Sequence, residues 1–129
     1  MWQKKAVPVP ELSAPGYNPS HEQCVVAGNL VFVAGQTGLR NGTIPPLFTD
    51  QVRQAFLNID AALRAAGVTF ADIVSMTVFL TDVRLQPDFS KVRREVLGPH
   101  LPSSATIGVR QLFDPRAMIE IQVTALRSA

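Results

Sequence analysis

A chain of 129 residues, of which 47% are hydrophobic and 17% charged, is long enough for one hydrophobic core and too short for two. Its net charge of +2 excludes the strong positive field that attracts a nucleic-acid backbone. The single cysteine, Cys24, excludes an intrachain disulfide, and no run approaches the roughly 18 apolar residues of a membrane helix. We therefore expect a single domain over residues 1–129, a cytoplasmic location, no membrane partner and no nucleic-acid partner.

The N-terminal part of the chain predicts an irregular segment followed by a β-hairpin. Residues 1–20 hold several prolines and form a lead-in with one short strand near its start. Two runs rich in β-branched residues, 22–27 and 30–34, then flank Gly28 and Asn29, a pair typical of a two-residue hairpin turn. Further glycines and prolines predict a loop up to position 46.

A helix and a central strand follow this loop. Apolar residues recur at helical spacing over 52–66, with Thr49 expected to cap the start of the helix and Gly67 to end it. Residues 73–81 alternate in polarity and are rich in β-branched and aromatic side chains, which indicates a strand. Because the helix is amphipathic, we expect it to cover a sheet.

A second helix is predicted from Pro87 to Gly98. It places Phe89 and two valines inward, and we interpret its charged residues as a solvated face: Lys91, Arg93, Arg94 and Glu95. Two strands, over 105–109 and 117–126, complete the chain. Strands and helices mixed in this order predict an α+β fold with both helices on one face of the sheet.

The last strand indicates what the helices leave uncovered. The side chains expected to lie under the helices are all apolar: Ile119, Ile121, Val123 and Ala125. The opposite face of this strand mixes apolar, hydroxyl and amide groups with one acid, Glu120. A half-polar surface of this kind suits association between subunits, with polar groups marking the clefts.

Four segments, in this order, resemble the RidA/YjgF family from about His21 to the C-terminus. They are Leu30-Val31-Phe32-Val33-Ala34-Gly35-Gln36, Asn58 with Ala65-Ala66-Gly67, Met76-Thr77-Val78-Phe79-Leu80-Thr81-Asp82, and Ile119-Glu120-Ile121. The resemblance implies a chorismate-mutase-like α+β fold, a mixed six-stranded sheet with two helices on one face, assembled as a homotrimer with clefts between subunits. It also implies hydrolysis of reactive enamines and imines, such as 2-aminoacrylate, to a keto acid and ammonia, with no metal and no cofactor.

In the family pattern an arginine stands two residues after a proline, as Pro-x-Arg-Ser, and its guanidinium forks onto the substrate carboxylate. Here Ser104 stands at that position, two residues after Pro102. His21 stands where many relatives have a tyrosine and Ser90 where many have an asparagine, whereas the acidic residue is kept as Glu120. We therefore expect a small imine, enamine or related metabolite as the ligand, and inefficient hydrolysis of 2-aminoacrylate.

Glu120 and His21 are the candidate catalytic residues. A carboxylate in a strand suited to burial has either a chemical task or a structural partner, so a salt bridge at a subunit interface is the alternative for Glu120. His21 would act beside Glu120 as an acid or base, or else lie at the surface. Ser104 and Thr106 share one strand face and are expected to offer hydroxyls to a ligand near Glu120. The candidate binding residues are Ser104, Thr106, Ser90 and Asn29.

Other chemistries have less support. The histidines and the cysteine lack the spaced partners of a metal site, and no Gly-x-Ser-x-Gly elbow precedes Ser104. Basic residues are not interleaved with aromatic ones, and Trp2 and Tyr17 lie in the lead-in, which disfavours the ribonuclease activity often ascribed to the family. Two interpretations stay open: a cofactor-independent deaminase or hydrolase, and a non-catalytic trimer that binds a metabolite or a partner protein. Arg110 or Arg116 of a neighbouring subunit is the alternative source of the missing guanidinium.

Overall fold

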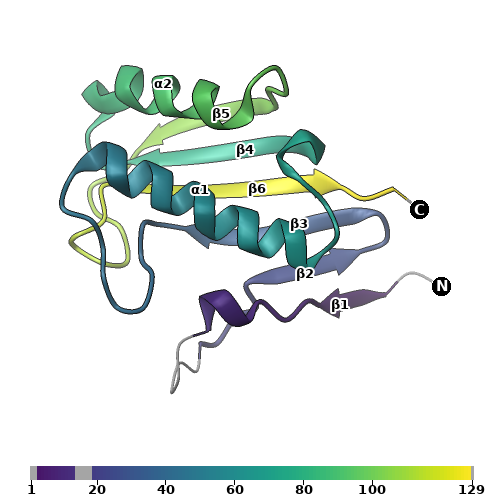
Figure 1. Cartoon of the computed structure of the whole chain (residues 1–129). Helices are drawn as coiled ribbons and strands as arrows, with labels where there is room; N and C mark the ends of the chain where they lie inside the picture. The colour runs from purple at the N-terminus through teal and green to yellow at the C-terminus, as the bar shows by residue number, and fades with distance from the viewer. Residues whose placement is uncertain (1–2, 14–18, 129) are drawn as a thin grey trace.

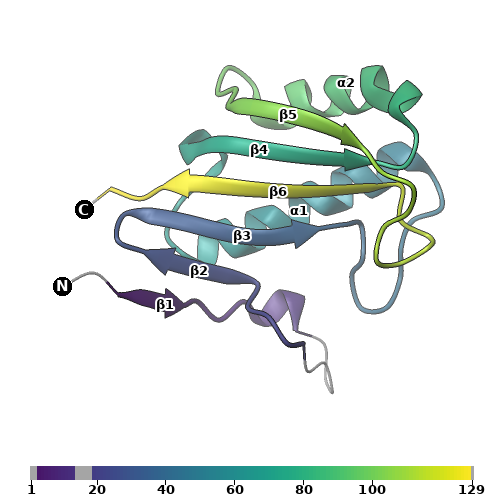
Figure 2. The same cartoon turned by 180° about the vertical axis from the view of Figure 1, so that it is seen from behind.

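The computed structural model describes residues 3–13 and 19–128, so Trp2 and Tyr17 lie outside the described residues. A mixed six-stranded sheet, in the order β1-β2-β3-β6-β4-β5, carries both helices on one face (Figure 1). Seen from behind, the other face has no described helix over it (Figure 2). This is the predicted α+β fold. Its elements are β1 (Lys4–Ala6), β2 (Cys24–Ala27), β3 (Leu30–Gln36), α1 (Phe48–Ala65), β4 (Ile73–Leu80), α2 (Gln86–Leu97), β5 (Ser103–Gly108) and β6 (Ile119–Leu126), with short 3-10 turns η1 (Pro10–Leu12), η2 (Phe70–Asp72) and η3 (Val83–Leu85).

The pairing of the strands decides which residues meet. β2 and β3 form the predicted hairpin around Gly28, which has a φ of +60°. β6 lies in the middle of the sheet, antiparallel to both β3 and β4. β4 and β5 are parallel because α2 carries the chain back over the sheet between them. β1 and β5 therefore form the two edges of the sheet.

The two ends of α1 differ in how well the sequence predicts them. The helix begins at Phe48, and the amide of Gln51 already donates to the carbonyl of Leu47 at 3.0 Å. Leu47 is thus the N-cap residue, and the prediction that Thr49 caps the helix is wrong, because Thr49 lies inside the first turn. The predicted end at Gly67 is confirmed, since this residue has a φ of +78° just after the last turn.

The core lies between the sheet and the two helices. Phe56 of α1 and Phe89 of α2 stack with their ring centroids 6.3 Å apart, above the buried Met76 and Val78 of β4. Cys24 is fully buried, and this burial raises the pKa of its thiol, so the residue serves as a small apolar side chain. Both helices contribute to this core. In the described part of the chain, no helix is long and apolar enough to cross a membrane.

The uncovered face of the sheet is half apolar, as predicted. Along β6 buried apolar residues alternate with more exposed ones, and Glu120 is on the uncovered side. Phe32, Ile107 and Leu126 share that side and remain 43%, 43% and 46% exposed. The homotrimer expected from the resemblance would remove such side chains from water, and it stays a prediction.

Candidate functional site

A cavity of about 540 Å³ lies where the segment before β2, the end of β3, the start of β6 and the loop between β5 and β6 come together. Its lining includes both candidate catalytic residues, Glu120 from β6 and the exposed His21 from the segment before β2. The structure thus brings these two residues to one cavity from distant parts of the chain. No hydrogen bond joins the two side chains in the described structure, and both line the cavity.

Glu120 is held in the cavity in an unusual way for a carboxylate. Its side chain is half-buried, and no described residue donates a hydrogen bond to it. It lies directly over the backbone of Gly35 in β3, where an added Cβ would be only 2.7 Å from Oε2 of Glu120. Partial removal from water raises the pKa of Glu120, because the charged form loses hydration without gaining a partner. The carboxyl group is therefore suited to hold and release a proton.

Asp114, on the same cavity wall, has the opposite environment. Hydrogen bonds from the Arg116 side chain, at 2.8 and 3.0 Å, lower the pKa of Asp114 to about 2, with a further contribution from the Arg116 amide. The cavity thus combines one carboxylate that stays charged with one that is inclined to protonate. Since the Arg116 guanidinium is already engaged by Asp114, the structure gives no support to its expected role for a neighbouring subunit.

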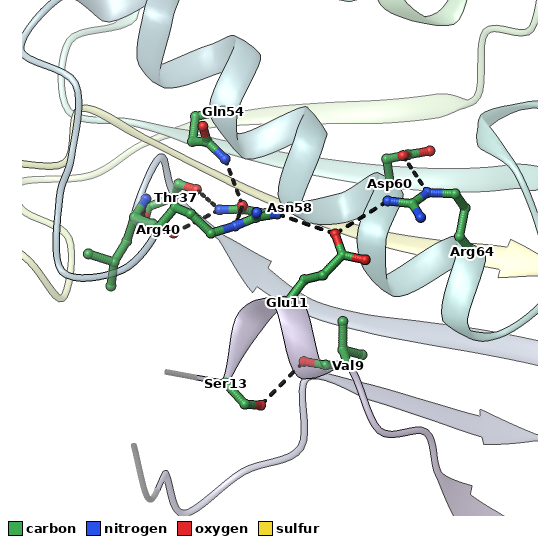
Figure 3. Close-up of polar contacts among 10 residues, drawn as sticks. Val9, Glu11, Ser13, Thr37, Arg40, Gln54, Asn58, Asp60 and Arg64 are labelled. Atoms are coloured by element: carbon green, nitrogen blue, oxygen red, sulfur yellow. Dashed lines mark hydrogen bonds and ion pairs between the residues drawn. The ribbon is translucent and has the colours of Figure 1, made fainter. Parts of the chain in front are cut away.

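Asn58, a residue of the family resemblance with no role in the sequence analysis, fixes the loop that follows β3. It is fully buried in α1, and its Nδ2 donates to the carbonyls of Thr37 and Leu39 at 3.1 and 2.9 Å. Its Oδ1 accepts from Arg40 Nε and from Gln54 Nε2, both at 3.0 Å (Figure 3). Because Thr37 and Leu39 also line the cavity, Asn58 is a positioning residue for that wall.

Glu11 extends the same polar cluster to the N-terminal segment. Its carboxylate lies 3.4 Å from Nη2 of Arg64 in α1 and 3.9 Å from Nη2 of Arg40 (Figure 3). The short turn η1 is therefore held against α1 by charge, ahead of the segment that carries His21 into the cavity. Such half-exposed ion pairs add little stability, so we assign this contact a role in orientation.

Gln51 is a second buried amide that the sequence analysis missed. Its Nε2 donates to the carbonyls of Pro45 and Arg116, at 2.9 and 3.0 Å, and its Oε1 accepts from the amide of Met118 at 2.8 Å. The loop that carries Asp114 is thereby tied to α1. A signal was present in the sequence, because Gln51 and Asn58 are seven residues apart and so lie on the same side of the helix, among buried residues.

Ser104 and Thr106 lie away from this cavity. In the parallel pairing of β4 with β5 they are beside Met76 and Val78, whose side chains point under the helices. Glu120 points to the other face of the sheet. The expectation that the two hydroxyls lie near Glu120 is therefore wrong within one chain, because a side chain on one face of a strand cannot reach the other face.

Asn29 is also remote from Glu120 within the chain. It lies in the hairpin turn beside Leu30, which pairs with Leu126, whereas Gln36 at the other end of β3 pairs with Ile121. Six residue steps of β3, at about 3.3 Å each, separate these two ends of the strand. Asn29 lines a shallow hollow with Lys4 and Gly28 instead, so the structure does not bring it to the Glu120 cavity.

Ser90 shares a second, smaller hollow with Ser104 and two arginines of α2. One of them, Arg93, departs from the expected solvated face. It is half-buried, with its guanidinium 4.7 Å above the ring of Phe89 and its Nη1 donating to Ser104 Oγ at 2.8 Å. The long side chain folds back over the residue four positions earlier, so a helix position that points outward still yields a half-buried charge.

Comparison with known proteins agrees with this fold. Residues 12–127 match the family model described as Endoribonuclease L-PSP. The RutC family protein YjgH of Escherichia coli is 42% identical over 110 residues, which are 81% of each chain. The 2-iminobutanoate/2-iminopropanoate deaminase of Dermatophagoides farinae is 30% identical over 79% of this chain and 81% of its own. The crystal structure of E. coli TdcF with bound serine superposes with a TM-score of 0.88 at 29% identity, over 96% of this chain and 99% of that one. The chain therefore belongs to the Endoribonuclease L-PSP family, the RidA/YjgF family that its sequence resembles.

Proposed function

We propose that the chain is a cofactor-independent deaminase that hydrolyses a small imine or enamine in the cavity of Glu120. The observation that carries this proposal is the half-buried carboxylate of Glu120, which has a raised pKa and no donor among the described residues. The name of the Dermatophagoides relative, 2-iminobutanoate/2-iminopropanoate deaminase, supports this class of reaction.

The chemistry of imine hydrolysis fits such a group. Water adds to the carbon of the C=N bond while a proton passes to the nitrogen, and the resulting carbinolamine then collapses to a carbonyl compound and ammonia. Glu120 takes the proton from the attacking water and returns it to the leaving nitrogen, so one carboxyl group serves both steps. His21 lines the same cavity and is proposed to orient the water, while Asp114 keeps a fixed negative charge that favours a cationic iminium substrate.

Assembly is part of this proposal. A single chain places Glu120 and Ser104 on opposite faces of the sheet, so a site that uses both requires a second copy. The exposed apolar residues on the uncovered face supply the surface for it. We propose a homotrimer, and sedimentation that gives the 14.0 kDa mass of a single chain would contradict it.

Non-catalytic binding is the second candidate. It is favoured by Ser104 at the position where the resemblance expects an arginine, since a hydroxyl does not replace a two-pronged guanidinium contact. The same substitution leads us to propose low efficiency on 2-aminoacrylate even if the chain is an enzyme. TdcF, crystallised with bound serine, shows that a relative holds an amino acid.

A direct assay separates the two candidates. Imines are generated from a panel of amino acids with an amino-acid oxidase, and ammonia release is followed with the wild type, with Glu120→Gln and without protein. Gln122→Ala is the matched control, because Gln122 is exposed on the same face of β6 two residues away. Hydrolysis that depends on Glu120 and survives in Gln122→Ala supports the deaminase. A wild-type rate equal to the rate without protein overturns it and leaves ligand binding.

A further inference from the structure

On the helix-covered side of the sheet, a hollow of about 150 Å³ lies between the middle of α2 and the start of β5. It is lined by Ser90, Arg93, Arg94, Leu101, Pro102 and Ser104. Two of these residues are arginines, and neither has a carboxylate partner in the described part of the chain. The acidic residue of this helix turn, Glu95, is engaged with Arg53 at 3.0 Å. Positive charge therefore collects in this hollow without compensation.

The guanidinium of Arg93 is held in place before any ligand arrives. It lies on the ring of Phe89, which keeps it from swinging into solvent. Nη1 donates to Ser104 Oγ at 2.8 Å and contacts Met76 Sδ at 3.9 Å. The Nε and Nη2 hydrogens have no acceptor among the described residues, and they form one edge of the planar fork. Such an edge matches the spacing of the two oxygens of a carboxylate.

The electrostatics of the free hollow are unfavourable. Burial lowers the pKa of Arg93, and the nearby charge of Arg94 lowers it further. Both effects mean that the cation is less well stabilised here than in water, and a bound anion would relieve both. Ser90 offers a further donor, because its Oγ accepts from Gln86 Nε2 at 3.1 Å and its own hydrogen stays available.

We propose that this hollow is a carboxylate-binding site, in which the Nε–Nη2 edge of Arg93 binds both oxygens of a small organic acid and Ser90 adds a third hydrogen bond. The volume accommodates about five water-sized groups, enough for a carboxylate with a short carbon stem. In this chain the guanidinium that binds the carboxylate thus comes from α2, whereas the family pattern places it at the position of Ser104 in β5. If the bound acid is the imine substrate, that substrate is an imino acid. Only this identification rests on the proposed function.

Binding is tested without turnover. Pyruvate and its uncharged counterpart pyruvamide are titrated into the full chain by calorimetry, and inorganic phosphate forms a third arm. We expect pyruvate to bind and pyruvamide not to bind. Arg93→Gln should weaken pyruvate binding by about tenfold or more, because it removes a charged two-pronged contact. Arg93→Lys keeps the positive charge but not the two-pronged geometry, so its affinity for pyruvate should lie between those of the wild type and Arg93→Gln.

Controls keep the test decisive. Arg53→Gln removes a more exposed arginine outside the hollow and should leave pyruvate binding unchanged. Thermal unfolding confirms that each variant is folded. Equal binding of pyruvate by wild type and folded Arg93→Gln, or equal binding of pyruvamide and pyruvate, overturns the site. Tighter binding of phosphate than of pyruvate overturns the assignment to carboxylates.

The outcome is separable from that of the proposed function. Pyruvate binding and imine hydrolysis are measured on the same preparations of the wild type and Arg93→Gln, so each result is read independently of the other. A chain that binds pyruvate through Arg93 but hydrolyses no imine keeps the site and overturns the deaminase. A chain that hydrolyses imines equally well with Arg93→Gln keeps the deaminase and overturns the identification of the bound acid as the imine substrate, whereas the site itself is decided by the pyruvate titration.

Discussion

The Glu120 cavity and the Arg93 hollow have one physical property in common. Each keeps a half-buried ionisable group without an opposite charge beside it, a carboxylate in one and a guanidinium in the other. The cavity is walled by loops that buried amides tie to α1, whereas the hollow is made rigid by one aromatic ring. They lie on opposite faces of the sheet, and in the function proposed above the cavity supplies proton transfer while the hollow supplies anchoring.

Loss of the Glu120 carboxyl should have the largest effect. We expect Glu120→Gln to lower imine hydrolysis by about two to four orders of magnitude, the usual contribution of a general acid or base. Its raised pKa means that the folded chain holds this proton more tightly than the unfolded chain, so the contribution of this group to stability falls as the pH rises past the ordinary glutamate range. Unfolding of Glu120→Gln at several pH values should lack that decline. A hydrolysis rate that survives the substitution would place proton transfer elsewhere.

Asn58→Leu should disturb the cavity and leave the hollow intact. The change leaves the carbonyls of Thr37 and Leu39 without their buried donor and should lower the free energy of unfolding by about 3 kcal/mol. Gln54→Ala, which removes one of the four bonds and no loop contact, should cost less than about 1 kcal/mol. Denaturant unfolding measures both variants. Weaker pyruvate binding in folded Asn58→Leu would show that the two regions are coupled within one chain.

A double substitution that moves the guanidinium from α2 to β5 tests how the hollow contributes to the reaction. In Arg93→Asn/Ser104→Arg the arginine returns to the position of the family pattern, and hydrolysis of 2-aminoacrylate should rise by about tenfold or more. Ser104→Arg alone should gain less, because the guanidinium of Arg93 already lies 2.8 Å from the side chain of residue 104. Initial rates with a serine dehydratase as the source of 2-aminoacrylate decide this. No gain in either variant would mean that the carboxylate contact does not limit the reaction.

The smallest effect is expected at the ion pair on the cavity wall. Arg116→Gln should return the pKa of Asp114 from about 2 toward 3.8, which NMR titration of the carboxyl carbon measures directly. Because the lowered pKa stabilises the fold above the ordinary aspartate range and this contribution is lost as the pH falls toward 2, the variant should be less stable than the wild type at neutral pH, and the difference should disappear as the pH falls toward 2. Arg84→Gln makes the equivalent change at Asp82, outside the cavity. A change in KM with both variants would indicate a general charge effect.

The parts of the structure that the sequence predicts are those decided by near neighbours. The turn at Gly28, the helix end at Gly67 and the alternation along β6 each follow from a few adjacent residues. The face on which Ser104 lies does not, because it depends on the parallel pairing of β5 with β4 that the crossover of α2 creates. Arg93 could have been suspected, since Phe89 precedes it by four positions on the same side of the helix.

The exposure of β5 has a consequence for handling the protein. All six residues of this edge strand are exposed, none is charged and none is a proline that would block pairing, while β4 is its only partner among the strands of residues 3–13 and 19–128. Unprotected edges of this kind recruit strands from other chains and start aggregation. Whatever covers β5 in solution therefore also keeps the chain dispersed, and a substitution that breaks this cover should produce precipitate at concentrations where the wild type stays clear.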